Sequence, residues 1–190
     1  LLGDVSGKRV VDMCAAPGGK TAQLAVAGAE VTAVEVSKNR MALLKANMKR
    51  LKLDVIYVAM DASKWKPGFK PDAILLDAPC SATGTLRRHP DVALNRQPED
   101  VSRLVATQKK LLNLALDMLK PGGRLVYAVC SLQPEEGEGQ ISGLLAARKD
   151  VTLEPAAGFS EFTTSRGEIR TLPCHNMDGF YAALLTKAKA

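Results

Sequence analysis

Short apolar runs alternate with longer segments that have the spacing of amphipathic helices along most of the chain. The apolar runs predict buried strands at 9–13, 31–36, 55–58, 73–76 and 124–129, with closing strands at 151–153 and 179–186. The segments between them predict helices from the glycine turn to about residue 27, at 38–51, at 98–119 and at 134–148. Helices of this length between strands act as crossover connections, so the pattern predicts a mostly parallel, doubly wound α/β sheet.

Local signals fix several of the helix ends. Ser37 is a good N-cap for the second helix, and Pro98 suits the first position of the third. The sequence Lys120-Pro121-Gly122-Gly123 stops that helix. We find no repeat or long polar linker, and 190 residues with 46% apolar side chains suffice for one domain spanning 1–190.

The residues with unusual chemistry follow the predicted strands. These are Cys14 to Lys20, Glu35, Asp61, Asp77 to Cys80, and Cys130 with Ser131. In an open parallel sheet, ligands bind beyond the carboxyl ends of the strands. We therefore expect these residues to meet at one rim of the sheet.

The turn Pro17-Gly18-Gly19 lets backbone approach a ligand, although a purely structural strand-to-helix turn explains it equally well. The turn matches neither a dinucleotide fingerprint nor a phosphate-binding P-loop. Glu35, about 20 residues from the start of the turn, is placed to accept both hydroxyls of a ribose, or is an ordinary surface acid. Together with Asp61, these features favour S-adenosyl-L-methionine over NAD.

The four cysteines lie far apart in the sequence, with no CxxC pair and no histidine cluster, so we expect no metal site. Cys14 and Cys174 are interpreted as small buried apolar residues. Cys80 and Cys130 each follow a strand, and neighbouring strands would bring both thiols to one pocket. A thiol that adds to carbon 6 of a pyrimidine activates carbon 5 toward a methyl donor, and a second acid or base must then release the product. The residues alone leave open which thiol attacks.

Lys and Arg exceed Asp and Glu by 26 to 20, which gives a net charge of +6 and favours an anionic partner. A basic run follows Cys80: Arg87, Arg88, His89, Arg96, Arg103, Lys109 and Lys110. It predicts phosphate contacts at the pocket mouth, or simply a solvated face. No apolar run approaches the length of a membrane-spanning helix, so we expect a cytoplasmic protein without a membrane partner.

Four motifs occur together and in order: Asp12-Met13-Cys14-Ala15-Ala16-Pro17-Gly18-Gly19-Lys20-Thr21, Asp77-Ala78-Pro79-Cys80-Ser81, Arg87-Arg88-His89-Pro90-Asp91, and Cys130-Ser131 with Pro134-Glu135-Glu136. In these motifs the chain resembles the catalytic domain of the Sun/Fmu (RsmB-type) RNA cytosine-5 methyltransferases. The resemblance implies a Rossmann-like class I methyltransferase with a seven-stranded sheet and helices on both faces. It also implies S-adenosyl-L-methionine as cofactor and small-subunit (16S) ribosomal RNA as substrate. We expect a monomer.

The resemblance assigns roles residue by residue. The methionine part of the cofactor is held by Cys14, Ala15, Ala16, Pro17, Gly18, Gly19 and Lys20; Glu35 holds the ribose, and Asp61 and Asp77 complete the site. Cys130 is the nucleophile and Cys80 assists product release, while Arg87, Arg88 and His89 are expected to contact RNA.

Two residues depart from the family pattern: Glu35 replaces the more frequent Asp, and Val129 replaces the usual Thr before Cys130. The family's helical N-terminal RNA-binding domain is absent from this chain, so we expect weaker RNA binding. The alternatives are the same chemistry on transfer RNA or another RNA, and a catalytically silent RNA-binding module.

Overall fold

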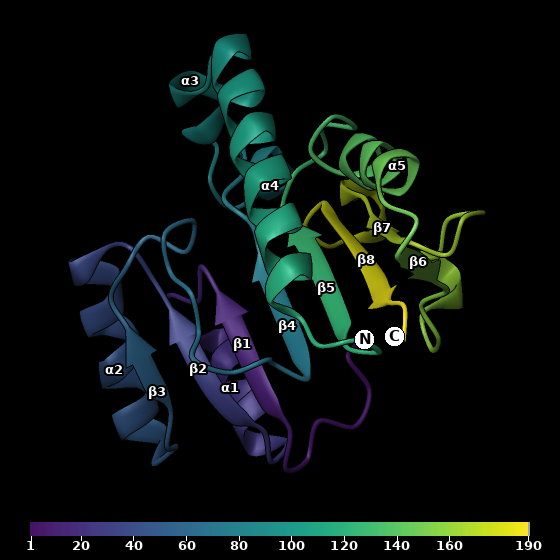
Figure 1. Cartoon of the computed structure of the whole chain (residues 1–190). Helices are drawn as coiled ribbons and strands as arrows, with labels where there is room; N and C mark the ends of the chain where they lie inside the picture. The colour runs from purple at the N-terminus through teal and green to yellow at the C-terminus, as the bar shows by residue number, and fades with distance from the viewer. Residues whose placement is uncertain (190) are drawn as a thin grey trace.

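The computed structural model describes residues 1–189 and contains one mixed sheet with helices on both faces (Figure 1). The strands are β1 (Arg9–Met13), β2 (Glu30–Val34), β3 (Ile56–Val58), β4 (Ala73–Asp77), β5 (Arg124–Val129), β6 (Val151–Glu154), β7 (Ile169–Thr171) and β8 (Phe180–Lys187). The helices are α1 (Gly19–Val26), α2 (Lys38–Leu51), α3 (Val92–Asn95), α4 (Pro98–Met118) and α5 (Glu138–Ala147), with short 3-10 turns η1 (Thr83–Thr85), η2 (Ser160–Phe162) and η3 (Pro173–His175).

The strand order is β3-β2-β1-β4-β5-β8-β6, and β1 to β5 are parallel to one another. β8 runs antiparallel to β5, β6 and β7. The prediction of a mostly parallel α/β sheet is therefore confirmed. The expected number of seven strands is wrong, since the sheet has eight. β6 and β7 pair with successive parts of β8 and so share the seventh position, and the three residues of β7 are too few to give a sequence signal.

Two helical layers cover the sheet. α1 and α2 lie on one face, where Met41, Leu44 and Met48 of α2 pack against Ala33 of β2. α4 and α5 lie on the other face, in front of the sheet in Figure 1, and bury residues such as Leu112 against the side chains of β4 and β5. Both faces of the central strands are thus buried, which explains why their sequences are continuous apolar runs.

Most predicted elements are confirmed within a few residues, and α2 has the predicted bounds. α5 differs because it begins at Glu138, whereas the sequence predicts a start near Pro134. Residues 134–137 form turns instead, and within them the side chain of Glu136 is directed into the protein, where it is fully buried. The short helix α3 was not predicted.

No helix within residues 1–189 is long and apolar enough to cross a membrane.

Candidate active site

A cavity of about 770 Å³ lies at the carboxyl ends of the parallel strands. Its lining includes Cys14 after β1, Glu35 after β2, Asp61 after β3, Asp77 and Cys80 at the end of β4, and Cys130 after β5. The parallel arrangement predicts this convergence, because it carries the end of every strand to the same edge of the sheet.

The glycine turn forms one side of the site. Gly18 has a φ of +103°, and a Cβ there would lie 3.1 Å from the side chains of both Leu44 and Met48 of α2. Glycine is therefore needed both for the backbone conformation and for the close approach of α2. Ala15 and Ala16 are buried beneath the turn, while Pro17 and Gly19 are exposed. Of the turn residues, Cys14 reaches the cavity lining.

Glu35 joins the glycine turn to the start of α2. Its carboxylate accepts hydrogen bonds from the backbone N–H of Ser37 at 2.9 Å and of Ala16 at 3.4 Å, and Arg40 lies 3.6 Å away. The side chain is almost fully buried in the cavity wall. Each carboxylate oxygen can accept a further hydrogen bond, so Glu35 can also bind hydroxyls of a ligand.

Two further carboxylates complete the wall. The Asp77 carboxylate lies 2.7 Å from the Lys20 ammonium, so the start of α1 is tied to the end of β4. Asp61 accepts a hydrogen bond from the backbone N–H of Ser63 at 2.8 Å, and this bond lowers the pKa of Asp61 below its ordinary value. Lys110 of α4 donates to the Ser63 hydroxyl at 3.2 Å.

The thiols of Cys80 and Cys130 meet directly. Their sulfur atoms are 3.5 Å apart, and both side chains line the cavity. A hydrogen bond from the Cys80 thiol lowers the pKa of Cys130, and the Lys20 charge acts in the same direction. The same hydrogen bond and the burial of its sulfur raise the pKa of Cys80. The pair therefore favours a Cys130 thiolate beside a protonated Cys80.

The other cysteines differ from this pair. Burial, followed by the nearby Glu35 charge, raises the pKa of Cys14 to about 12, so Cys14 remains a neutral thiol. The expectation that Cys174 is buried is wrong, because it lies exposed in the short turn η3. Within residues 1–189, no group of three or more His, Cys, Asp or Glu side chains is arranged to hold a metal ion.

Asp12 of β1 lies beneath the site and is 1% exposed. Its Oδ2 accepts a hydrogen bond from the Thr21 hydroxyl at 2.6 Å, while Oδ1 has no hydrogen-bond partner in the described part of the chain. Burial raises the pKa of Asp12 from 3.8 to about 7, and the neighbouring Asp77 adds to this increase. Near neutral pH, Asp12 is therefore partly protonated.

The basic run is divided by the fold. Arg96 and Lys110 line the cavity, whereas Arg87, Arg88 and His89 lie outside its lining. Both arginines form ion pairs with Asp178: Arg87 lies 3.3 Å from its carboxylate, and Arg88 Nε donates to it at 2.6 Å. Asp178 precedes β8 and holds both guanidinium groups there. Arg40 of α2, which the sequence did not single out, also lines the cavity.

Sequence reasoning also missed a buried carboxylate behind the thiols. Glu136 is 0% exposed and accepts hydrogen bonds from Ser81, Ser131 and Gln108. The available signal was the motif Pro134-Glu135-Glu136, which we interpreted as a helix start.

The loops that carry the cysteines cross the chain before β8 at a pair of glycines. Gly84 N–H donates to the Cys130 carbonyl at 3.1 Å, and Gly179 N–H donates to the Gly84 carbonyl at 2.8 Å. A Cβ on Gly84 would lie 1.9 Å from the Gly179 carbonyl oxygen. Only glycine permits this approach, which holds the Cys80 and Cys130 loops against each other.

Comparison with known proteins shows the family of this chain. The family model described as 16S rRNA methyltransferase RsmB/F matches residues 1–186. The chain belongs to the RsmB/F family. The resemblance found in the sequence is thereby confirmed.

Similar RsmB/F relatives are the proteins named ribosomal RNA small subunit methyltransferase B from Shewanella oneidensis and Vibrio vulnificus. They are 39% and 41% identical to this chain, over 99% and 95% of its length. The chain spans 45% and 42% of those two proteins, less than half of each.

Solved structures agree with this assignment. NSun6 from Pyrococcus horikoshii, solved with SFG, is 34% identical with a TM-score of 0.84, over 96% of this chain and 48% of that chain. A methyltransferase homolog protein from Pyrococcus horikoshii is 33% identical with a TM-score of 0.82, over 98% of this chain and 63% of that chain. The expected Rossmann-like class I methyltransferase fold is thus confirmed.

The first prediction concerns the buried Asp12. Because its pKa is higher in the folded chain than the ordinary 3.8, its contribution to stability is complete below about pH 4 and is lost as the pH rises to about 7. Over this window the contribution falls by about 1.4 kcal/mol per pH unit. Asp12→Asn imitates the neutral acid and does not titrate.

Urea unfolding of both proteins between pH 4.5 and 8 measures this effect. We expect the free energy of unfolding of the wild type to fall relative to that of Asp12→Asn up to about pH 7, and the difference to level off above it. Parallel curves for the two proteins would show that Asp12 does not titrate in this range.

The second prediction concerns the thiol pair. Cys80→Ala removes the hydrogen-bond donor to Cys130, so the pKa of Cys130 should rise. We expect iodoacetamide to alkylate Cys130 more slowly at pH 7 in this variant, with the pH profile shifted to higher values. Peptide mass spectrometry measures the rate.

Cys174→Ala is the control and should leave the Cys130 profile unchanged, since Cys174 lies exposed in η3. If the pH dependence of Cys130 alkylation is identical in Cys80→Ala and in the wild type, Cys80 does not lower the pKa of Cys130.

Proposed function

We propose that this chain transfers a methyl group from S-adenosyl-L-methionine to carbon 5 of a cytosine in 16S ribosomal RNA, through a covalent adduct with Cys130. The observation that carries the proposal is the pair of sulfurs 3.5 Å apart in a cavity that also contains Glu35 and Asp61. Membership of the RsmB/F family supports ribosomal RNA as the substrate.

The residues at the rim fit the proposed cofactor. Glu35 can accept the ribose hydroxyls, and Asp61 lies in the same wall as an acceptor for the adenine amino group. The turn from Cys14 through Lys20 would hold the methionine part, with Asp77 beside it. The buried Asp12 Oδ1 below the turn offers a further polar atom close to Lys20 and Asp77. Acidic side chains also suit the positive charges of this cofactor.

The reaction begins at Cys130. Its thiolate adds to carbon 6 of the cytosine, and a bond forms between sulfur and carbon as the ring electrons move to carbon 5. The Asp77 carboxylate hydrogen-bonds the amidine edge of the base and stabilises this adduct. S-adenosyl-L-methionine would supply the methyl group that carbon 5 accepts, and the electron pair of the broken carbon–sulfur bond would remain on its sulfur.

Cys80 completes the sequence. While Cys130 is a thiolate, the Cys80 proton is held in the hydrogen bond between the two sulfurs. Once Cys130 is bonded to carbon, this acceptor loses its charge and Cys80 can release its proton to water. The Cys80 thiolate then takes the proton from carbon 5, the bond between sulfur and carbon 6 breaks, and Cys130 leaves as a thiolate.

We assign RNA contacts to Arg87, Arg88 and His89. The two arginine side chains remain more than half exposed, at 55% and 56%, although both pair with Asp178. Exposed guanidinium groups can bind phosphate oxygens in a bidentate manner. His89 is exposed in the same loop.

The third prediction separates the roles of the thiols. RNA that carries 5-fluorocytosine has no proton to release at carbon 5, so the methylated adduct should remain bound to the protein after denaturation. We expect this complex in wild type and Cys80→Ala, and its loss in Cys130→Ala, as measured by gel electrophoresis under denaturing conditions.

The reverse pattern would exchange the two assignments. The absence of the complex in the wild type and in both variants would contradict the covalent adduct and would favour the alternative of a silent binding module.

The fourth prediction concerns the arginines. Replacing Arg87 and Arg88 by Ala should weaken RNA binding at low salt and flatten its salt dependence, by about 0.7 in log–log slope for each single-strand phosphate that is no longer neutralised. The affinity for S-adenosyl-L-methionine should not change.

Fluorescence anisotropy between 50 and 300 mM salt, roughly the range over which added salt weakens binding to phosphates, measures the slope. Replacing Lys49 and Arg50, two exposed cations on α2, by Ala is the matched control and should keep the wild-type slope. Equal slopes for both double variants would exclude Arg87 and Arg88 from the RNA interface.

A further inference from the structure

The buried Glu136 lies between the two loops that carry the thiols. Ser81 directly follows Cys80, and Ser131 directly follows Cys130. The Glu136 carboxylate accepts from the Ser81 N–H at 2.9 Å, from the Ser81 hydroxyl at 2.5 Å and from the Ser131 hydroxyl at 2.5 Å. One side chain therefore binds the residue next to each cysteine.

Residues of two other elements, α4 and β5, hold Glu136 in place. Gln108 of α4 donates through one Nε2 to the Glu136 carboxylate and to the Pro79 carbonyl, both at 2.9 Å. The Tyr127 hydroxyl of β5 donates to the Glu136 backbone carbonyl at 2.6 Å. The loops are thus tied to α4 and to the central sheet.

The chemistry of this cluster requires hydrogen-bond acceptors at the position of the Glu136 side chain. The backbone N–H of Ser81 and the amide N–H of Gln108 can only donate, and both point at Oε1. An ionised carboxylate offers several acceptor positions and no donor. Buried donors without an acceptor are costly, so a small apolar side chain at this position would let the loops separate.

We propose that Glu136 is the positioning residue that holds the Cys80 and Cys130 sulfurs together by clamping Ser81 to Ser131. It does not touch the reacting atoms. Any effect of Glu136 on methyl transfer rests on the proposed function. The hydrogen bonds that hold the two cysteine loops together do not depend on it.

The clamp has an electrostatic consequence as well. The negative charge of Glu136 is one of the contributions that raise the pKa of Cys80. This charge is the smallest of those contributions, and it adds to the hydrogen bond with Cys130 and to burial, which act in the same direction on the Cys80 thiol. Loss of Glu136 should affect both the distance between the sulfurs and the reactivity of Cys130.

Two thiol reactions test the clamp in the 190-residue chain, with Cys174→Ser as a common background. Diamide oxidises Cys80 and Cys130 to a disulfide and takes up their two electrons and two protons, at a rate that depends on how closely the sulfurs are held. Iodoacetamide alkylation of Cys130 as a function of pH reports its thiolate. Circular dichroism establishes that each variant is folded.

We expect Glu136→Ala to slow disulfide formation about tenfold or more and to move the Cys130 alkylation profile to higher pH. Ser131→Ala, which removes one of the clamped groups, should act in the same direction with a smaller effect. Glu136→Gln keeps the shape and an acceptor oxygen for Ser81 and Gln108, so it should restore the rate to within about threefold of the wild type.

Glu135→Ala is the matched control, because Glu135 is the exposed neighbour of Glu136. Its rate and profile should equal those of the wild type. If folded Glu136→Ala keeps the wild-type rate and profile, the proposal is wrong. If Glu136→Ala does not fold, wild-type behaviour of Ser131→Ala overturns the proposal in the same way.

The two proposals fail separately. The thiol readouts need neither RNA nor S-adenosyl-L-methionine. A wild-type chain that shows the expected thiol behaviour but no methyl transfer would contradict the proposed function and leave the clamp intact.

Discussion

The common direction of β1 to β5 is the constraint on which the site depends. Parallel strands need crossover helices, and the crossovers place the end of every strand at one edge of the sheet. Residues that are as far apart in sequence as Cys14 and Cys130 consequently line one cavity. Helices lie on both faces of the sheet (Figure 1), and the cavity of about 770 Å³ lies at this edge.

The strand ends alone do not determine how the two sulfurs meet, because each cysteine lies in a loop. Close backbone contact at Gly84 and Gly179 and the buried Glu136 hold these loops together. The two thiols therefore have packed, hydrogen-bonded loops behind them and the cavity in front of them.

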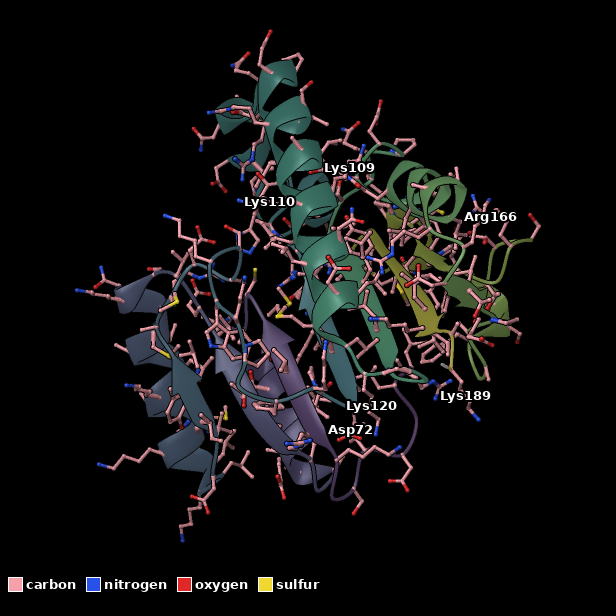
Figure 2. The ribbon with its side chains drawn as sticks, in the orientation of Figure 1. Asp72, Lys109, Lys110, Lys120, Arg166 and Lys189 are labelled. Atoms are coloured by element: carbon pink, nitrogen blue, oxygen red, sulfur yellow. The ribbon has the colours of Figure 1, made fainter. Side chains whose placement is uncertain are left out.

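Figure 2 shows Lys109 and Lys110 on α4, and Lys110 lines the cavity beside the strand ends. Lys109, its neighbour in the sequence, lies outside the lining of this cavity.

The sequence predicted the features that depend on local patterns. The parallel strands and α2 follow from apolar periodicity and a cap, and the acids after the strands follow from the topology. The failures have tertiary causes. The pairing of Arg87 and Arg88 with Asp178 involves a residue about 90 positions away. Glu136 breaks the helical pattern because its bonds to Ser81 and Gln108 outweigh an earlier helix start, and no local signal reports those partners.

Nucleoside analysis of the methylated product tests whether this chain makes 5-methylcytidine through Cys130. The chain is incubated with labelled S-adenosyl-L-methionine and 16S ribosomal RNA, the RNA is digested, and the labelled nucleoside is identified by mass spectrometry. We predict that the label is found in 5-methylcytidine and that Cys130→Ala produces none. Label in another nucleoside, or undiminished 5-methylcytidine from Cys130→Ala, would contradict it.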